Sequence, residues 1–309
     1  MQKIIVICGP TASGKTALSV ELAKKINGEI VSCDSMQIYD EMLIGTARPT
    51  LEEMQGIKHY LVGCVKPTMR YSVSEYKKEA EKAIKEILSK NKVPIVVGGT
   101  GLYVNSLIYG IDYPEIETDL EYRKKLEERV NNEGLTKLYE EAQYIDEEAM
   151  QKISKNDEKR ILRVLEIYHQ TGKTKTMLEK ESRANGVNYD FRVFAIDMPR
   201  EVLYSRINKR VDIMLEQGLI NEVKELYKEY GERLYTSAQA IGYKEVIDYF
   251  KNVYTKEEMI EKIKMETRRY AKRQLTWFRK IQEIKWLNGE ADIQNNINII
   301  LEDYKIEEK

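Results

Sequence analysis

Residues 4–16, IIVICGPTASGKT, decide the fold of this chain. The apolar run at residues 4–8 is rich in β-branched side chains and ends in glycine, which is typical of a buried parallel strand. Residues 9–16 match the pattern Gly-x-x-x-x-Gly-Lys-Thr at every specified position, and residues 17–26 carry apolar side chains at helical spacing. A strand, a glycine loop and a helix in this order predict a loop that binds di- or triphosphate groups.

The fixed positions of this loop have chemical reasons. Gly9 and Gly14 let the backbone turn so that several N–H groups face inward, and the following helix adds partial positive charge at its N-terminus. Lys15 can reach a terminal phosphate, and the Thr16 hydroxyl is placed to bind Mg²⁺, the cofactor we expect. The predicted loop consists of Gly9, Pro10, Thr11, Ala12, Ser13, Gly14, Lys15 and Thr16. Kinases, ATPases and other transferases share such a loop, so it does not identify the ligand.

Strand and helix patterns alternate along the rest of the chain. Short apolar runs at residues 30–33, 93–97 and 191–196 predict buried strands, and residues 74–90 predict a helix. Alternating strands and helices build a parallel sheet with right-handed crossovers. We therefore predict an α/β fold in which a P-loop NTPase-like parallel sheet is flanked by helices.

The composition changes near residue 115, and from there to about 183 the chain is strongly charged, helical in pattern and without a strand-like run. We interpret residues 116–187 as an all-helical insertion domain between two parts of one core, residues 1–115 and 188–309. Residues 200–283 are predicted to be mostly helical. The tail at 284–309 is predicted to be poor in strands and partly frayed.

The bulk composition limits the classes of partner. Lys and Arg number 50 against 51 Asp and Glu, so any basic patch must be local. Three cysteines without a CxxC pair, with only His59 and His169, argue against a zinc site. No apolar run approaches the roughly 18 residues of a membrane helix. We expect a cytoplasmic protein that has no membrane contact and acts as a monomer.

Five segments resemble the tRNA dimethylallyltransferase (isopentenyltransferase) family, in family order. Three are residues 34–39 (DSMQIY), 98–103 (GGTGLY) and 272–279 (KRQLTWFR). Residues 45–49 (GTARP) and 240–245 (AIGYKE) are also similar. Eukaryotic members carry a C-terminal zinc finger, and no Cys or His follows His169 here, so the chain resembles the bacterial form.

The resemblance implies that dimethylallyl diphosphate is the donor bound by the loop, and that its five-carbon group moves to the exocyclic N6 amine of the adenosine on the 3′ side of the tRNA anticodon. Asp34, Thr100 and Lys15 are then the catalytic candidates. Asp34 follows a strand, where it could orient the amine and take its proton. A Mg²⁺ ligand or a helix cap is the alternative for Asp34, and a helix cap is the alternative for Thr100.

Arg206 and Arg210 lie one helical turn apart and resemble the family's arginines near the diphosphate. Residues 264–280 hold seven basic side chains against one acid, with aromatic residues between them, and could neutralise RNA phosphates. Trp277 and Phe278 could stack on bases or anchor the helix, and Arg269, Arg273 and Lys280 would fall near one helical stripe. The positions that the resemblance implies for tRNA contact are Asp34, Ser35, Met36, Gln37, Thr100, Arg123, Lys159, Arg160, Ile161, Leu162, Arg163, Gly242, Tyr243, Lys244, Lys272 and Arg273.

Two segments depart from the family pattern, one at residues 156–163 and the other at residues 59–60. Residues 156–163 resemble the family's Asn-Asp-x-x-Arg-x-x-Arg segment, but the two positions that are usually neutral carry charge here, as Glu158 and Lys159. Where the family usually has two adjacent histidines, this chain has His59-Tyr60, so we assign His59 no catalytic role.

Three alternative functions stay open. An adenylate isopentenyltransferase would share the loop, Asp34 and Thr100, but would not need the helical insertion or the basic segment at 264–280. A P-loop small-molecule kinase leaves residues 34–39 and 98–103 unexplained. A non-catalytic RNA-binding protein leaves the intact phosphate loop unexplained.

Overall fold

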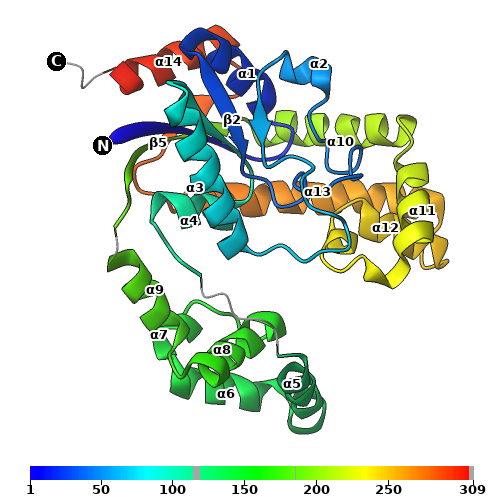
Figure 1. The fold of residues 1–309 in the computed structure, drawn as a ribbon. Coiled ribbons are helices and arrows are strands. Elements are labelled where there is room, and N and C mark those ends of the chain that lie inside the picture. Colours follow the sequence, from blue (N-terminus) through cyan, green and yellow to red (C-terminus); the bar gives the residue numbers. More distant parts are fainter. Residues whose placement is uncertain (114–118, 185, 306–309) are drawn as a thin grey trace. The chain divides into compact units, whose positions relative to one another are not determined.

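The computed structural model describes residues 1–113, 119–184 and 186–305 (Figure 1). It divides into two compact units, one formed by Met1–Ile108 with Asn188–Lys309 and the other by Tyr109–Val187. The domain boundary predicted at residues 115 and 116 lies outside the described residues. Within these ranges, no helix combines the length and the apolar character that crossing a membrane requires.

The first unit is built on a six-stranded parallel sheet in the order β3-β2-β4-β1-β5-β6. Its strands are β1 (Gln2–Cys8), β2 (Gly28–Ser32), β3 (His59–Tyr60), β4 (Val93–Gly98), β5 (Tyr189–Asp197) and β6 (Lys285–Asn288). Cys8 pairs with Gly98 of β4, and Ser32 of β2 pairs with Val97. Three strand ends therefore meet at one edge of the sheet, as the predicted α/β fold requires.

Alternate residues of β1 serve the two faces of the sheet, because side chains point to opposite sides with a period of two. Ile5 and Ile7 pack with helices α1 (Lys15–Ile26), α10 (Arg200–Glu216) and α14 (Ile293–Lys305). Ile4 and Val6 pack with α3 (Val73–Ser89), α4 (Gly101–Ile108) and the end of α13 (Lys256–Phe278). Burial of both faces explains why the strand is a continuous apolar run.

A third apolar cluster lies beside the sheet and joins the loop after β2 to the helices after α10. Ile38, Tyr39 and Met42 pack there against α11 and α12. The remaining elements of this unit are α2 (Leu51–Met54), α11 (Leu219–Tyr230), η1 (Gly231–Arg233), η2 (Ser237–Gln239) and α12 (Tyr243–Phe250).

The second unit is helical and has its own core. It consists of α5 (Leu120–Glu133), α6 (Leu135–Ile145), α7 (Glu147–Met150), α8 (Glu158–Thr171) and α9 (Lys175–Ala184). Leu126, Leu138, Ile161 and Leu165 are buried together. Asp146 accepts hydrogen bonds from Ala149 and from both the N–H and the hydroxyl of Thr176, and so ties α7 to α9.

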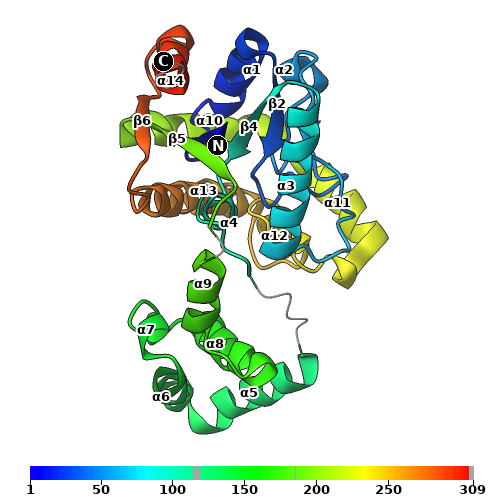
Figure 2. The ribbon, with the colours of Figure 1, turned by 60° about the vertical axis from the view of Figure 1, so that its left-hand side comes forward.

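The tail is poor in strands, as predicted, but it is not frayed over residues 285–305. Strand β6 pairs with β5 from Lys285 to Asn288, and α14 lies beside α1 (Figure 2). Only Leu287 of β6 is buried, so the strand shows no alternating pattern in the sequence. The predicted basic stripe also needs correction, because α13 ends at Phe278 and Lys280 follows the helix.

We expect the tail to stabilise the α/β unit. Ile300 is fully buried against α1 and the sheet, whereas the neighbouring Ile299 is 43% exposed. Ile300→Ala should lower the free energy of unfolding by about 2–5 kcal/mol because it leaves a cavity. Ile299→Ala, the matched control, should cost at most about 1 kcal/mol. Urea unfolding followed by tryptophan fluorescence measures both, since Trp277 and Trp286 belong to this unit. Equal effects would contradict a packed tail.

Candidate functional site

The loops after β2 and β4 are joined at the carboxyl edge of the sheet. Cys33 N–H donates to Val97 O at 2.7 Å, and Thr100 N–H donates to Cys33 O at 3.1 Å. The Thr100 hydroxyl accepts from Ser35 N–H at 2.9 Å and donates to Ser35 Oγ at 3.3 Å. The Thr100 side chain therefore binds the loop that carries Asp34, while the Thr100 carbonyl oxygen accepts from Tyr103 N–H and Val104 N–H in the first turn of α4.

Asp34 is half-buried, and one of its oxygens is used by its own loop. Oδ1 accepts from Met36 N–H at 2.9 Å and from Gln37 N–H at 3.2 Å. Oδ2 makes no hydrogen bond to the residues that the structure describes. The carboxylate is thus both a cap of the loop backbone and an oriented group with an oxygen left to accept a proton.

The phosphate loop has the local geometry that an anion requires. Gly14, in the left-handed conformation with φ 90°, is the N-cap of α1 and offers no side chain to the first amides of the helix. Ser13 Oγ is buried and has no hydrogen-bond partner among the described residues. A buried hydroxyl without a partner is costly, so a phosphate oxygen would suit this position.

Two cations lie at this loop. Lys15 Nζ donates to Gly9 O at 2.9 Å and to Pro10 O at 2.6 Å. Burial lowers the pKa of Lys15 to about 8; the negative charge of Asp34 opposes this shift and the positive charge of Arg210 adds to it. Arg210 donates to Thr11 Oγ1 at 3.3 Å, and burial lowers its pKa too. Arg206 is exposed one turn earlier on α10.

Sequence reasoning assigned no specific role to Tyr270 and overlooked Gln274, both on α13. Burial raises the pKa of Tyr270; the charge of Asp34 adds to this shift, and hydrogen bonding with Thr100 opposes it. Gln274 is buried and contacts both the phosphate loop and the loop after β4. A glutamine or tyrosine within a basic helix carries no local signal, so only the tertiary structure reveals these contacts.

In the segments for which the resemblance implies tRNA contact, some side chains are bound within the protein and others are exposed. Gln37 donates to Thr46 O and Ala47 O, and so holds the loop at residues 45–49. Tyr243 is buried and donates to Glu222, which also accepts from the N–H groups of residues 43–45. Lys244 beside it is exposed. The Tyr243 ring is therefore not exposed for the predicted RNA contact, whereas the Lys244 side chain is.

In the basic segment at 264–280, three of the seven cations pair with acids, and the other four have no acidic partner among the described residues. Lys264 pairs with Asp212 at 2.7 Å, and Arg269 pairs with Glu266 at 2.7 Å. Lys272 and Arg273 are exposed and have no acidic partner among the described residues. Phe278 is fully buried, which makes it an anchor of the helix rather than a stacking platform.

In the helical unit, the predicted contacts cluster on α5 and α8. Ile161 and Leu162 are buried in the core, whereas Lys159 and Arg160 are exposed, and Arg160 pairs with Asp157 at 3.3 Å. Buried Glu166 binds two arginines, Arg123 at 2.9 Å and Arg163 at 3.2 Å.

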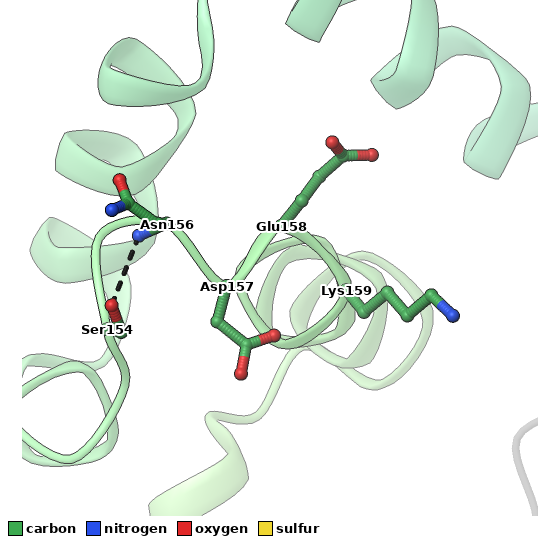
Figure 3. Close-up of a pocket in the computed structure, with 5 residues that line it drawn as sticks. All are labelled: Ser154, Asn156, Asp157, Glu158 and Lys159. Carbon is green, nitrogen blue, oxygen red and sulfur yellow. Dashed lines mark hydrogen bonds between the residues drawn. The ribbon is translucent and has the colours of Figure 1, made fainter. Parts of the chain in front are cut away.

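An open hollow lies at the N-terminus of α8, lined by Ser154, Asn156, Asp157, Glu158 and Lys159 (Figure 3). Asp157 accepts from Arg160 N–H and caps the helix. Two carboxylates therefore line this hollow against one ammonium group. That charge disfavours a phosphate in the hollow itself, whatever Lys159 contacts outside it.

Comparison with known proteins decides the family. A family model described as IPP transferase matches residues 37–281, which is more than half of the chain. The chain belongs to the IPP transferase family. A tRNA dimethylallyltransferase of Acetivibrio thermocellus is 49% identical over 288 residues, covering 93% of this chain and 92% of that protein. One from Halothermothrix orenii is 49% identical over 285 residues, covering 92% and 87%.

Solved structures agree with this family and with the predicted P-loop NTPase-like fold. The tRNA isopentenylpyrophosphate transferase of Bacillus halodurans matches with a TM-score of 0.73 and 42% identity, covering 98% of this chain and 96% of that one. A eukaryotic dimethylallyltransferase acting on tRNA matches with a TM-score of 0.81 and 31% identity, covering 100% and 82%. These comparisons assign no role to any single residue, so the roles of the phosphate loop, of Asp34 and of the other site residues stay predictions.

The Glu166 contacts generate a stability prediction. Glu166→Gln removes the charge that holds both arginines, and should lower the stability of the helical unit by about 1–3 kcal/mol. Glu140→Gln, at an exposed position of the same unit, is the control and should change stability by at most about 0.5 kcal/mol. Hydrogen exchange of α8 amides reports the opening of this unit. Unchanged protection in Glu166→Gln would show that the pairs contribute nothing.

Proposed function

We propose that this protein is a tRNA dimethylallyltransferase. It transfers the dimethylallyl group of dimethylallyl diphosphate to N6 of the adenosine on the 3′ side of the anticodon and releases diphosphate. The observation that carries the proposal is the joining of the Asp34 loop to Thr100 beside a cationic phosphate loop. A leaving-group site and a proton acceptor then share one edge of the sheet.

The proposed chemistry follows from these positions. The loop amides, the Ser13 hydroxyl, Lys15 and Arg210 would bind the diphosphate and stabilise the charge that develops as the carbon–oxygen bond breaks. The adenine nitrogen forms the new bond to carbon, and its proton passes to Asp34 Oδ2. Thr100 and Tyr270 would line the acceptor side, where Thr100 also fixes the Asp34 loop.

Mg²⁺ is the proposed cofactor, and it would offset the negative charge of the diphosphate. Thr16 is the residue placed to hold it, through one hydroxyl. Among the described residues, no group of three or more His, Cys, Asp and Glu side chains could hold a metal ion. This donor set fits a cation bound mainly by diphosphate oxygens and water, as Mg²⁺ commonly is.

The tRNA would meet exposed cations on both units. Lys272, Arg273 and Lys244 belong to the α/β unit, and Lys159 and Arg160 belong to the helical unit. These cations would contact phosphates near the anticodon stem-loop, because RNA backbones are bound by such side chains. We also propose that the enzyme acts as a monomer, and a tRNA substrate supports a place in the cytoplasm.

The alternatives explain less. An adenylate isopentenyltransferase has no use for the helical unit with its exposed cations. A small-molecule kinase gives no role to the Thr100 contact with the Asp34 loop. Both also lack support from the relatives, whose names are those of tRNA-modifying enzymes.

One experiment separates these functions. Purified protein with Mg²⁺ and dimethylallyl diphosphate is offered unmodified tRNA, AMP or no acceptor. We expect prenylated product only on tRNA, measured by mass spectrometry of nucleosides, and loss of product when EDTA removes the metal. Product on AMP would instead assign the adenylate enzyme, and product on neither acceptor would contradict the proposed function.

A second experiment tests the role of Asp34. Asp34→Asn keeps an oxygen for the Met36 and Gln37 amides but cannot take a proton, so kcat should fall about 10²–10⁴-fold. The Michaelis constant for the donor should stay within a few-fold. Asp40→Asn, at an exposed position of the same loop, is the control. Full activity of Asp34→Asn would reduce Asp34 to a loop cap.

A further inference from the structure

We infer that Gln274 is a positioning residue that holds the phosphate loop and the Thr100 loop in register, and so sets the separation between donor and acceptor. The inference rests on the proposed function and adds a residue to it. Gln274 is 5% exposed, on a helix whose neighbouring positions 272 and 273 are exposed. A buried amide on a charged helix needs partners for both of its polar groups.

Both partners are backbone groups of the site. The Gln274 Oε1 atom accepts from Thr11 N–H at 3.0 Å, and Nε2 donates to Gly99 O at 2.9 Å. Thr11 belongs to the phosphate loop, and Gly99 immediately precedes Thr100. A single side chain therefore joins the two loops through two directional hydrogen bonds.

The local packing is specific for this arrangement. A β-carbon added at Gly99 would lie 2.1 Å from Gln274 Nε2, so only glycine lets the amide reach the backbone there. Helix α13 contributes to the apolar cores on both faces of the sheet. Ala271 packs in the core that contains α1, and Phe278 packs in the core that contains α3. Gln274 lies between these two anchors along the helix, where it cannot shift without disturbing either core.

The same helix also reaches the acceptor side. The ring of Tyr270, one turn before Gln274, lies near Thr100 and Asp34. Thr11 is held from a second direction, since its hydroxyl accepts from Arg210 of α10. The phosphate loop is thus fixed to two helices, and the Gln274 side chain also joins it to the loop that carries Thr100.

An alkyl transfer needs this kind of register. The carbon that is attacked must lie in line between the adenine nitrogen and the leaving oxygen, and an error near 1 Å can cost about 100-fold in rate. The charge and hydrogen-bond donors that bind diphosphate remain when the two loops drift apart. Loss of Gln274 should therefore act on kcat more than on donor binding.

Two substitutions separate the two bonds. Gln274→Met keeps the length of the side chain and removes both bonds, so kcat should fall about 10- to 100-fold with a donor Michaelis constant within about three-fold. Gln274→Glu can still accept from Thr11 but cannot donate to Gly99 O when ionised. It also adds negative charge, so it should raise the donor Michaelis constant as well as lower kcat. Gln294→Met, an exposed glutamine on α14, is the matched control.

Hydrogen exchange gives a readout that does not depend on turnover. The Thr11 amide should exchange faster in Gln274→Met than in wild type, and should stay protected in Gln274→Glu. Each variant is compared at a temperature at which its melting curve shows it fully folded. If both folded variants keep wild-type kcat and Thr11 protection, the inference is wrong. If wild type itself transfers nothing to tRNA, the proposed function fails instead, and the exchange result still tests the contact.

Discussion

The site depends on one close backbone approach, between the ends of β2 and β4. A β-carbon added at Gly98 would lie 2.0 Å from Cys33 O, and the next hydrogen bond along joins Thr100 N–H to the same oxygen. This approach brings residue 34 and residue 100 to one place in the sheet edge. Without it, the Thr100 hydroxyl could not reach Ser35, and the acceptor side of the site would have no fixed geometry.

The phosphate loop gathers positive charge that burial removes from water. Lys15 and Arg210 are both partly desolvated, and the N-terminus of α1 adds partial positive charge next to them. Glu53 acts on Arg210, and Asp34 acts on both cations, although the Asp34 Oδ1 atom already accepts from two backbone amides. An anion with several oxygens would lower the electrostatic cost of this arrangement, which is why a diphosphate fits better than a neutral ligand.

Much of the fold could be predicted from local patterns, while the contacts that complete the site could not. The apolar run at residues 4–8 predicts the strand, and the spacing of Gly9, Gly14 and Lys15 predicts the loop and the start of the helix. Strand β6 has one buried side chain, Leu287, and so had no pattern to detect. Gln274 and Glu222 act through partners more than 170 residues away in the chain, which no spacing within one segment reveals.

The family resemblance indicated which segments could contact tRNA, but not which of their side chains are exposed. Residues 161, 162 and 243 fall in segments similar to those that contact tRNA, yet their side chains are buried in apolar cores. The net charge of −1 means that attraction to RNA must come from cations without acidic partners. Three basic residues of the 264–280 segment pair with Asp or Glu. Any RNA affinity of this segment should therefore come mainly from the exposed Lys272, Arg273 and Lys280, which have no acidic partner in the part of the chain that the structure describes.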